Sequence, residues 1–75
     1  MPKLPVLSGK KVLKVLQKEG FKFSRQKGSH VVMTKIVNGQ KLVTVFPMHK
    51  ELDPGTLLAI ISQAGMNREE FFKIL

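Results

Sequence analysis

The segment KGSHVVMT, Lys27 to Thr34, contains one of the two histidines of the chain, the only side chains that titrate near neutral pH. Gly28 and Ser29 precede His30, and a strand-like apolar run follows it. A Gly-Ser turn allows close approach of another backbone, a phosphate backbone among others. RNA cleavage needs a base for the 2′-hydroxyl proton, an acid for the leaving oxygen and cations for the charge developing at phosphorus. His30 could be that base, or it could be a strand residue with a local hydrogen bond.

Cationic side chains surround this histidine in the sequence. Arg25 and Lys27 precede it and Lys35 follows it. Their positive field favours the neutral imidazole, the form that accepts a proton. These three residues and Ser29 are therefore candidate RNA contacts and His30 is a candidate catalytic residue, while a strand histidine with only a structural role stays the alternative.

The net charge also favours a polyanionic partner. The 75 residues carry 13 Lys and Arg against 5 Asp and Glu, a formal charge of +8. Between Lys3 and Lys41 there are ten basic residues and a single acid, Glu19, whereas from Lys50 onward acids outnumber bases by four to three. Nucleic acid is the first partner that this asymmetry suggests, and a basic surface that only maintains solubility is the alternative.

The first predicted helix carries a row of lysines. Ser8 can cap a helix from about Gly9 to Glu19, and Gly20 can end it. Apolar residues occupy one side, and the lysines lie on the opposite side, where they are either solvated or directed at phosphates. We include this lysine row, Lys10, Lys11, Lys14 and Lys18, among the predicted RNA contacts.

The remaining pattern predicts three strands and two further helices. Residues 21–27, 30–36 and 41–46 alternate or are rich in β-branched side chains, and Asn38-Gly39 predicts a tight hairpin. Asp53-Pro54 opens a second helix that closes at Gly65, and Asn67 with Glu70 starts a short third one. The predicted fold is α+β in two layers, a three-stranded antiparallel sheet with helices on one face.

Composition excludes several other classes. There is no cysteine, which fits a reducing cytoplasm, and no apolar run approaches the roughly 18 residues of a membrane span. We predict one domain, residues 1–75, in which residues 1–7 form an extended arm.

Two further hypotheses concern the second histidine and a possible metal site. His49 precedes the second helix, where it could cap that helix, brace the loop or serve as a secondary catalytic group. A metal site from His30, His49 and Glu51 or Asp53 lacks any recognised ligand spacing. We therefore expect no metal and no cofactor.

With these residues in view, the chain resembles the HicA, or YcfA-like, toxin family. The resemblance rests on Gly20-Phe21, on GSH at residues 28–30, and on PMHKELDPGTLLAIISQAGMNREEF from Pro47 to Phe71. It implies a double-stranded-RNA-binding-domain-like αβββα fold and an mRNA interferase whose essential histidine is His30. It also implies a HicB-type antitoxin that covers this histidine. Met33 stands where members commonly carry an aromatic residue, a departure that bears on the substrate contacts implied by the resemblance and not on the family assignment.

Two alternatives to an active toxin remain from the sequence. One is a non-catalytic RNA-binding module of the same shape, and the other is an inactive component that only binds its antitoxin.

Overall fold

The computed structural model describes residues 4–75, and residues 1–3 of the predicted arm lie outside this range. In the described part of the arm, Leu4 and Leu7 pack against the core, and the Leu7 carbonyl accepts a 2.8 Å hydrogen bond from the Leu52 N–H. No helix within residues 4–75 has the length and apolarity needed to cross a membrane. The elements, in chain order, are α1 (Gly9–Lys18), β1 (Lys22–Lys27), β2 (His30–Val37), β3 (Gln40–Pro47), α2 (Pro54–Gln63) and α3 (Arg68–Lys73).

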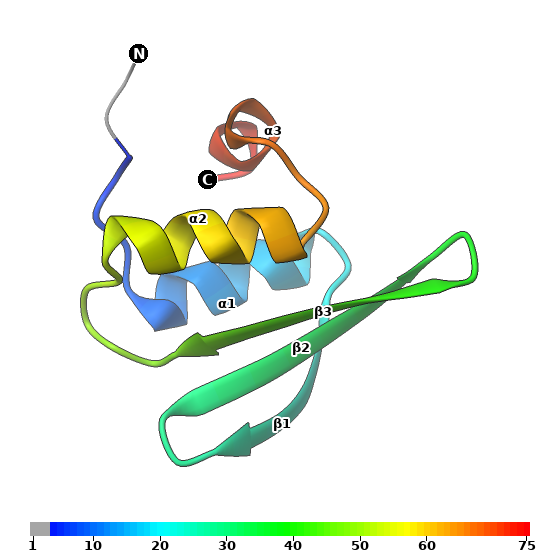
Figure 1. The fold of residues 1–75 in the computed structure, drawn as a ribbon, viewed down its shortest axis with the longest axis horizontal. Coiled ribbons are helices and arrows are strands. Elements are labelled where there is room, and N and C mark those ends of the chain that lie inside the picture. Colours follow the sequence, from blue (N-terminus) through cyan, green and yellow to red (C-terminus); the bar gives the residue numbers. More distant parts are fainter. Residues whose placement is uncertain (1–3) are drawn as a thin grey trace.

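The three strands form one open antiparallel sheet in the order β1-β2-β3, and α1 and α2 lie on one side of it (Figure 1). Val31 pairs with Phe46 and Met33 with Thr44, and all four side chains are buried in the layer between sheet and helices. The predicted α+β architecture is confirmed, because alternate residues of the central strand supply the core from one face only.

Helix caps fix where the helices begin. The Ser8 hydroxyl accepts a 3.0 Å hydrogen bond from the Lys11 N–H at the start of α1. Asn67 and Glu70 form a reciprocal capping box at the start of α3, with bonds of 2.8 and 3.0 Å. Each bond satisfies an N–H that the helix itself leaves unpaired, so the predicted cap residues define these boundaries.

The hairpin between β2 and β3 turns at Asn38 and Gly39, which have φ values of 51° and 78°. Two consecutive positive φ values suit the two-residue hairpin turn whose twist matches the strands, which confirms the hairpin prediction. The hairpin extends beyond the helices (Figure 1), and Ile36, Val37 and Val43 near its tip are exposed.

The first strand differs from its prediction. It begins at Lys22, one residue later than expected, and its register shifts between Phe23 and Arg25. Phe21 is buried, but Phe23 is 48% exposed and does not share the buried environment of Phe21. The physical reason is that β1 is an edge strand with a bulge, which interrupts the alternation that the sequence pattern assumes.

Candidate functional site

The turn between β1 and β2 places His30 at the end of the central strand. Gly28 has a φ of 60°, and a Cβ built on it would meet no atom within 4 Å. The Gln26 side-chain amide donates a 3.0 Å hydrogen bond to the Gly28 carbonyl and stabilises the turn. His30 follows as the first residue of β2 and is exposed. The turn therefore leaves both the Gly28 backbone and the imidazole accessible from outside.

The sheet register determines the neighbours of His30. It pairs with Lys27 on β1 and with Pro47 on β3. Since Val31 and Met33 are buried under the helices, His30 lies on the opposite, open face of the sheet. Directly paired side chains project from the same face, so Lys27 and His30 share it.

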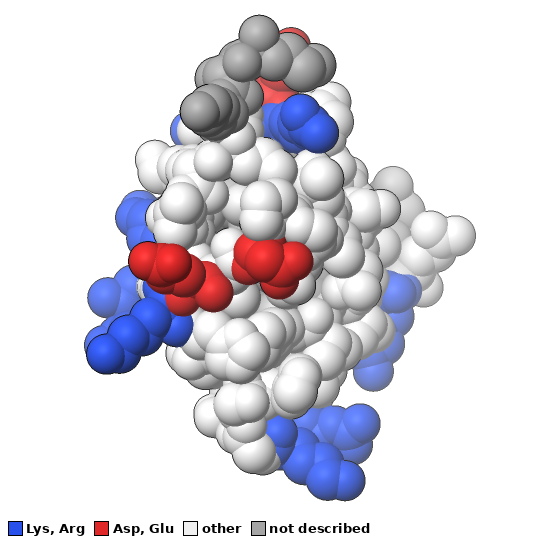
Figure 2. Space-filling view, turned by 60° about the vertical axis from the view of Figure 1, so that its left-hand side comes forward, with Lys and Arg blue, Asp and Glu red and all other residues white. Residues whose placement is uncertain are grey.

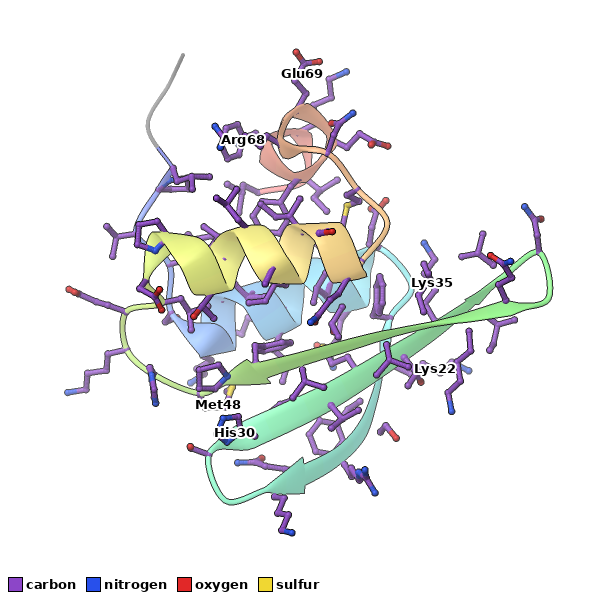
Figure 3. All side chains as sticks on the ribbon, viewed as in Figure 1. Lys22, His30, Lys35, Met48, Arg68 and Glu69 are labelled. Carbon is purple, nitrogen blue, oxygen red and sulfur yellow. The ribbon has the colours of Figure 1, made fainter. Side chains whose placement is uncertain are left out.

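Three segments meet behind this histidine. The Met48 N–H donates a 2.7 Å hydrogen bond to the Ser29 carbonyl, and the Gly9 N–H donates a 2.9 Å bond to the His49 carbonyl. Figure 3 shows Met48 beside His30 where β3 ends. The first bond joins the β1–β2 turn to the loop after β3, and the second joins that loop to the start of α1. The main chain next to His30 is therefore held by the loop, and the loop is held by α1.

Gly9 is the residue that permits this close approach. A Cβ at this position would lie 2.8 Å from the Met48 Cα and closer still to the Pro47 carbonyl oxygen. No side chain fits there unless backbone moves. This role of Gly9 was not predicted from the sequence, although a glycine directly after a capping serine, at the first helical position, is a signal that could have identified it.

Two of the predicted cations lie beside His30. Lys27 is its direct partner on β1, and Arg25 pairs with Val32 one position further along the same face. Both side chains are exposed. The open face around the imidazole is therefore cationic, as the sequence predicted for these two residues.

Lys35 lies elsewhere. It is five residues along β2, about 17 Å away at the usual rise per residue, and Figure 3 shows it near the other end of the strand from His30. Its ammonium nitrogen lies 5.6 Å from the centre of the Phe21 ring, a cation–π contact. Lys35 is thus not brought together with His30.

The lysine row of α1 is exposed along its whole length. Its first members follow Gly9 and therefore lie close to the loop behind His30, whereas Lys18 is about 13 Å further along the helix. Figure 2 shows a face on which Lys and Arg lie toward the edges and acidic groups lie near the centre, so positive charge is not uniform over the surface.

The second histidine has a structural role through its backbone. The cap of α2 is Asp53, which accepts from the Thr56 N–H at 3.4 Å and from its hydroxyl at 2.5 Å, so His49 does not cap that helix. These hydrogen bonds from Thr56 lower the pKa of Asp53 below its usual value of 3.8. His49 instead braces the loop, because its carbonyl accepts from Gly9 while its side chain is exposed. No group of three His, Asp or Glu side chains within the described range is arranged to hold a metal ion.

The comparison with known families identifies the family of this chain. The family model described as the HicA toxin of bacterial toxin–antitoxin systems matches residues 9–66. The chain belongs to the HicA toxin family. The family assignment predicted from the sequence is thereby confirmed, and an antitoxin partner is implied. No curated protein and no solved structure matches this HicA toxin.

The matched range includes every segment of the candidate site. It starts at Gly9, contains the GSH turn and the loop at Met48, and ends after α2, so α3 lies beyond it. The part of the HicA chain that matches the family is therefore also the part that positions His30.

Proposed function

We propose that this HicA toxin is an endoribonuclease, an mRNA interferase of the cytoplasm, and that His30 is its general base. The observation that supports the proposal most directly is the exposed imidazole of His30 at the end of the central strand, with Lys27 as its direct neighbour. A surface-exposed histidine held by a fixed backbone and flanked by cations suits proton abstraction from a polyanionic substrate.

In the proposed reaction, the neutral imidazole removes the proton from a ribose 2′-hydroxyl. The 2′-oxygen attacks the adjacent phosphorus, a P–O bond to the 2′-oxygen forms, and the bond to the 5′-oxygen breaks. The leaving 5′-oxygen takes up a proton from water, and the proton held by His30 then neutralises the hydroxide that is left. The products carry a 2′,3′-cyclic phosphate and a 5′-hydroxyl. Lys27 and Arg25 stabilise the negative charge that develops on the phosphoryl oxygens.

The remaining predicted contacts have separate roles in this proposal. Ser29 and the open backbone at Gly28 approach the RNA backbone beside the scissile phosphate. Lys10 and Lys11, at the start of α1, contact phosphates near the site, and Lys14 and Lys18 extend this contact along the strand. Lys35 binds RNA only if the substrate reaches the other end of the sheet.

Metal independence follows from the same chemistry, since a histidine base and lysine cations need no bound ion. Cleavage should therefore continue in EDTA. Loss of activity that one particular divalent ion restores, with RNA folding controlled for, would contradict this part of the proposal.

The test of the proposed function is the identity of the cleaved ends. Purified protein is incubated with RNA, and the products are examined for 2′,3′-cyclic phosphate and 5′-hydroxyl groups. A substrate with a single 2′-O-methyl group at the mapped cleavage site is the matched control, because it lacks the proton that His30 removes. We expect cleavage of the unmodified RNA only. Binding without cleavage would favour the non-catalytic RNA-binding module.

We also propose that the antitoxin is of the HicB type and covers His30. Bulk placed over one exposed imidazole is sufficient to exclude RNA from the site. Modification by diethylpyrocarbonate should be fast at His30 in the free toxin and slow in the complex, with the exposed His49 as an internal reference. Equal reactivity of His30 in both states would reject inhibition by direct occlusion.

A further inference from the structure

The two edges of the sheet are protected to different degrees. On β1, a bulge between Phe23 and Arg25 and the exposed cations Lys22, Arg25 and Lys27 oppose pairing with another strand. The β3 strand has no bulge in its pairing with β2, and Lys41 is its only charged residue. The sheet is therefore open to strand addition at β3 rather than at β1.

One hydrogen bond identifies which backbone groups of β3 point outward. The Val45 N–H donates to the Gln63 side-chain oxygen on α2 at 3.1 Å, so it is directed away from β2. In an antiparallel ladder, outward and inward residues alternate. Because the β2–β3 register is continuous, Val43 and Lys41 also direct their N–H and C=O groups to the open edge.

The side chains along this edge suit a partner strand with apolar and acidic residues. Val43 and Val45 are 41% and 44% exposed, and the tip of the hairpin projects beyond the helices (Figure 1). From Gly20 to Lys50 the sequence contains no Asp or Glu, so the whole sheet is cationic or neutral. An acidic strand therefore meets complementary charge at Lys41 and at neighbouring cations.

We propose that the antitoxin adds an acidic β-strand to the edge of β3, pairing with Lys41 and Val43. This inference rests on membership of the toxin family and not on the proposed cleavage. A second copy of this chain would bring lysines together without a carboxylate to pair with them. RNA cannot continue the ladder, because it lacks the alternating N–H and C=O groups of an extended peptide.

Gln63 limits how far along β3 an added strand can pair. Its side chain already satisfies the outward N–H of Val45, so an added strand can pair there only after Gln63 moves. Val45 is two residues before Pro47, the β3 partner of His30. A chain that continues past Val45 would therefore travel toward the end of the sheet where His30 lies, which connects edge docking with occlusion of the site.

The decisive measurement is amide hydrogen exchange by NMR on the wild-type toxin. It compares the free toxin with its complex with the purified product of the open reading frame next to its own, where we expect the antitoxin to be encoded. We expect the Lys41 and Val43 amides to exchange quickly in the free toxin and at least about tenfold more slowly in the complex. The Leu42 and Thr44 amides, which point toward β2, should change less. A complex in which the Lys41 and Val43 amides remain fast would overturn the proposal, as would failure of that product to bind.

A pair of variants tests the same edge by affinity. Val43→Pro removes the outward N–H, a change that edge strands tolerate, whereas Val43→Thr keeps it. We expect the Kd between the toxin and the product of the adjacent reading frame to be at least about tenfold higher for Val43→Pro than for Val43→Thr. Equal affinities would refute strand pairing at this position. If Val43→Pro does not fold, the exchange measurement on wild type decides.

Two controls separate this proposal from others. Free Val43→Pro should cleave RNA like wild type, so loss of docking with intact cleavage concerns the interface alone. A noncleavable 2′-O-methyl RNA should leave the Lys41 and Val43 amides unprotected. Protection of these amides by the RNA but not by the protein would reassign the edge to RNA and reject the proposal.

Discussion

Replacing Gly9 by alanine tests the packing that supports His30. The new Cβ would lie 2.8 Å from the Met48 Cα and nearer still to the Pro47 carbonyl oxygen. Ordinary contact begins near 3.4 Å, so at least 0.6 Å (3.4 − 2.8) must be gained by moving backbone rather than a flexible side chain.

The expected cost follows from two opposing effects. Overpacking costs about 1–3 kcal/mol, and replacing glycine in a helix recovers roughly 0.5–1 kcal/mol. Gly9→Ala should therefore lower the free energy of unfolding by about 1 kcal/mol, and by no more than about 2.5 kcal/mol. Each kcal/mol corresponds to roughly 4–8 °C in Tm for a domain of this size. Because Met48 donates to the Ser29 carbonyl, the same displacement should also slow RNA cleavage.

Gly55→Ala is the matched control. Gly55 is the second residue of α2, and a Cβ there would lie 3.4 Å from the Asp53 side chain, an ordinary contact. This variant should keep or raise Tm by circular dichroism and keep the cleavage rate. A Gly9→Ala protein as stable and as active as Gly55→Ala would refute the argument that the start of α1 fixes the loop behind His30.

Thr44, the lysines of α1 and Asp53 each provide a separate test. Thr44 is fully buried and its hydroxyl has no hydrogen-bond partner among the described residues. Thr44→Val should therefore raise the free energy of unfolding by about 1 kcal/mol. A Tm no higher than that of wild type would contradict this. If the α1 lysines contact single-stranded RNA phosphates, changing Lys11, Lys14 and Lys18 to Gln should flatten the plot of log affinity against log salt by up to about 2 units. Lys73→Gln on α3 should leave that slope unchanged, and an unchanged slope for the triple variant would mean that the row is only solvated. The pKa of Asp53 is lowered by Thr56, so its stabilising effect is complete above the unfolded value of 3.8 and is lost as pH falls through the folded value. Asp53→Asn, which still caps but does not titrate, should therefore lose less Tm than wild type between about pH 5 and about pH 2, and equal losses would contradict the assignment.

The local signals in the sequence were sufficient to predict the element order. Capping residues and the Asn38-Gly39 turn act within a few residues, so Ser8, Asp53 and Asn67 identify helix starts correctly. The bulge in β1 depends on how that strand pairs with β2, and no pattern within the strand itself specifies it.

The candidate site was predictable only in part. The neighbours of His30 within the turn could be inferred, and Lys27 does lie beside it. Lys35 is near His30 in sequence, but five residues of extended strand separate the two in space. Its cation–π contact with Phe21 depends on the tertiary fold and could not be predicted from the sequence. The bonds from Gly9 and Met48 join segments about 20 or more residues apart in sequence, so spacing alone could not predict them.

The most direct test of the proposed mechanism compares RNA cleavage by His30→Ala and His49→Ala at saturating enzyme. Both histidines are exposed, and the carbonyl through which His49 braces the loop is retained in its alanine variant. Circular dichroism and melting should show that both variants fold. We predict that His30→Ala lowers the single-turnover rate by at least about 100-fold, whereas His49→Ala cleaves close to the wild-type rate. A folded His30→Ala protein that cleaves as fast as wild type would contradict the assignment of His30 as the general base.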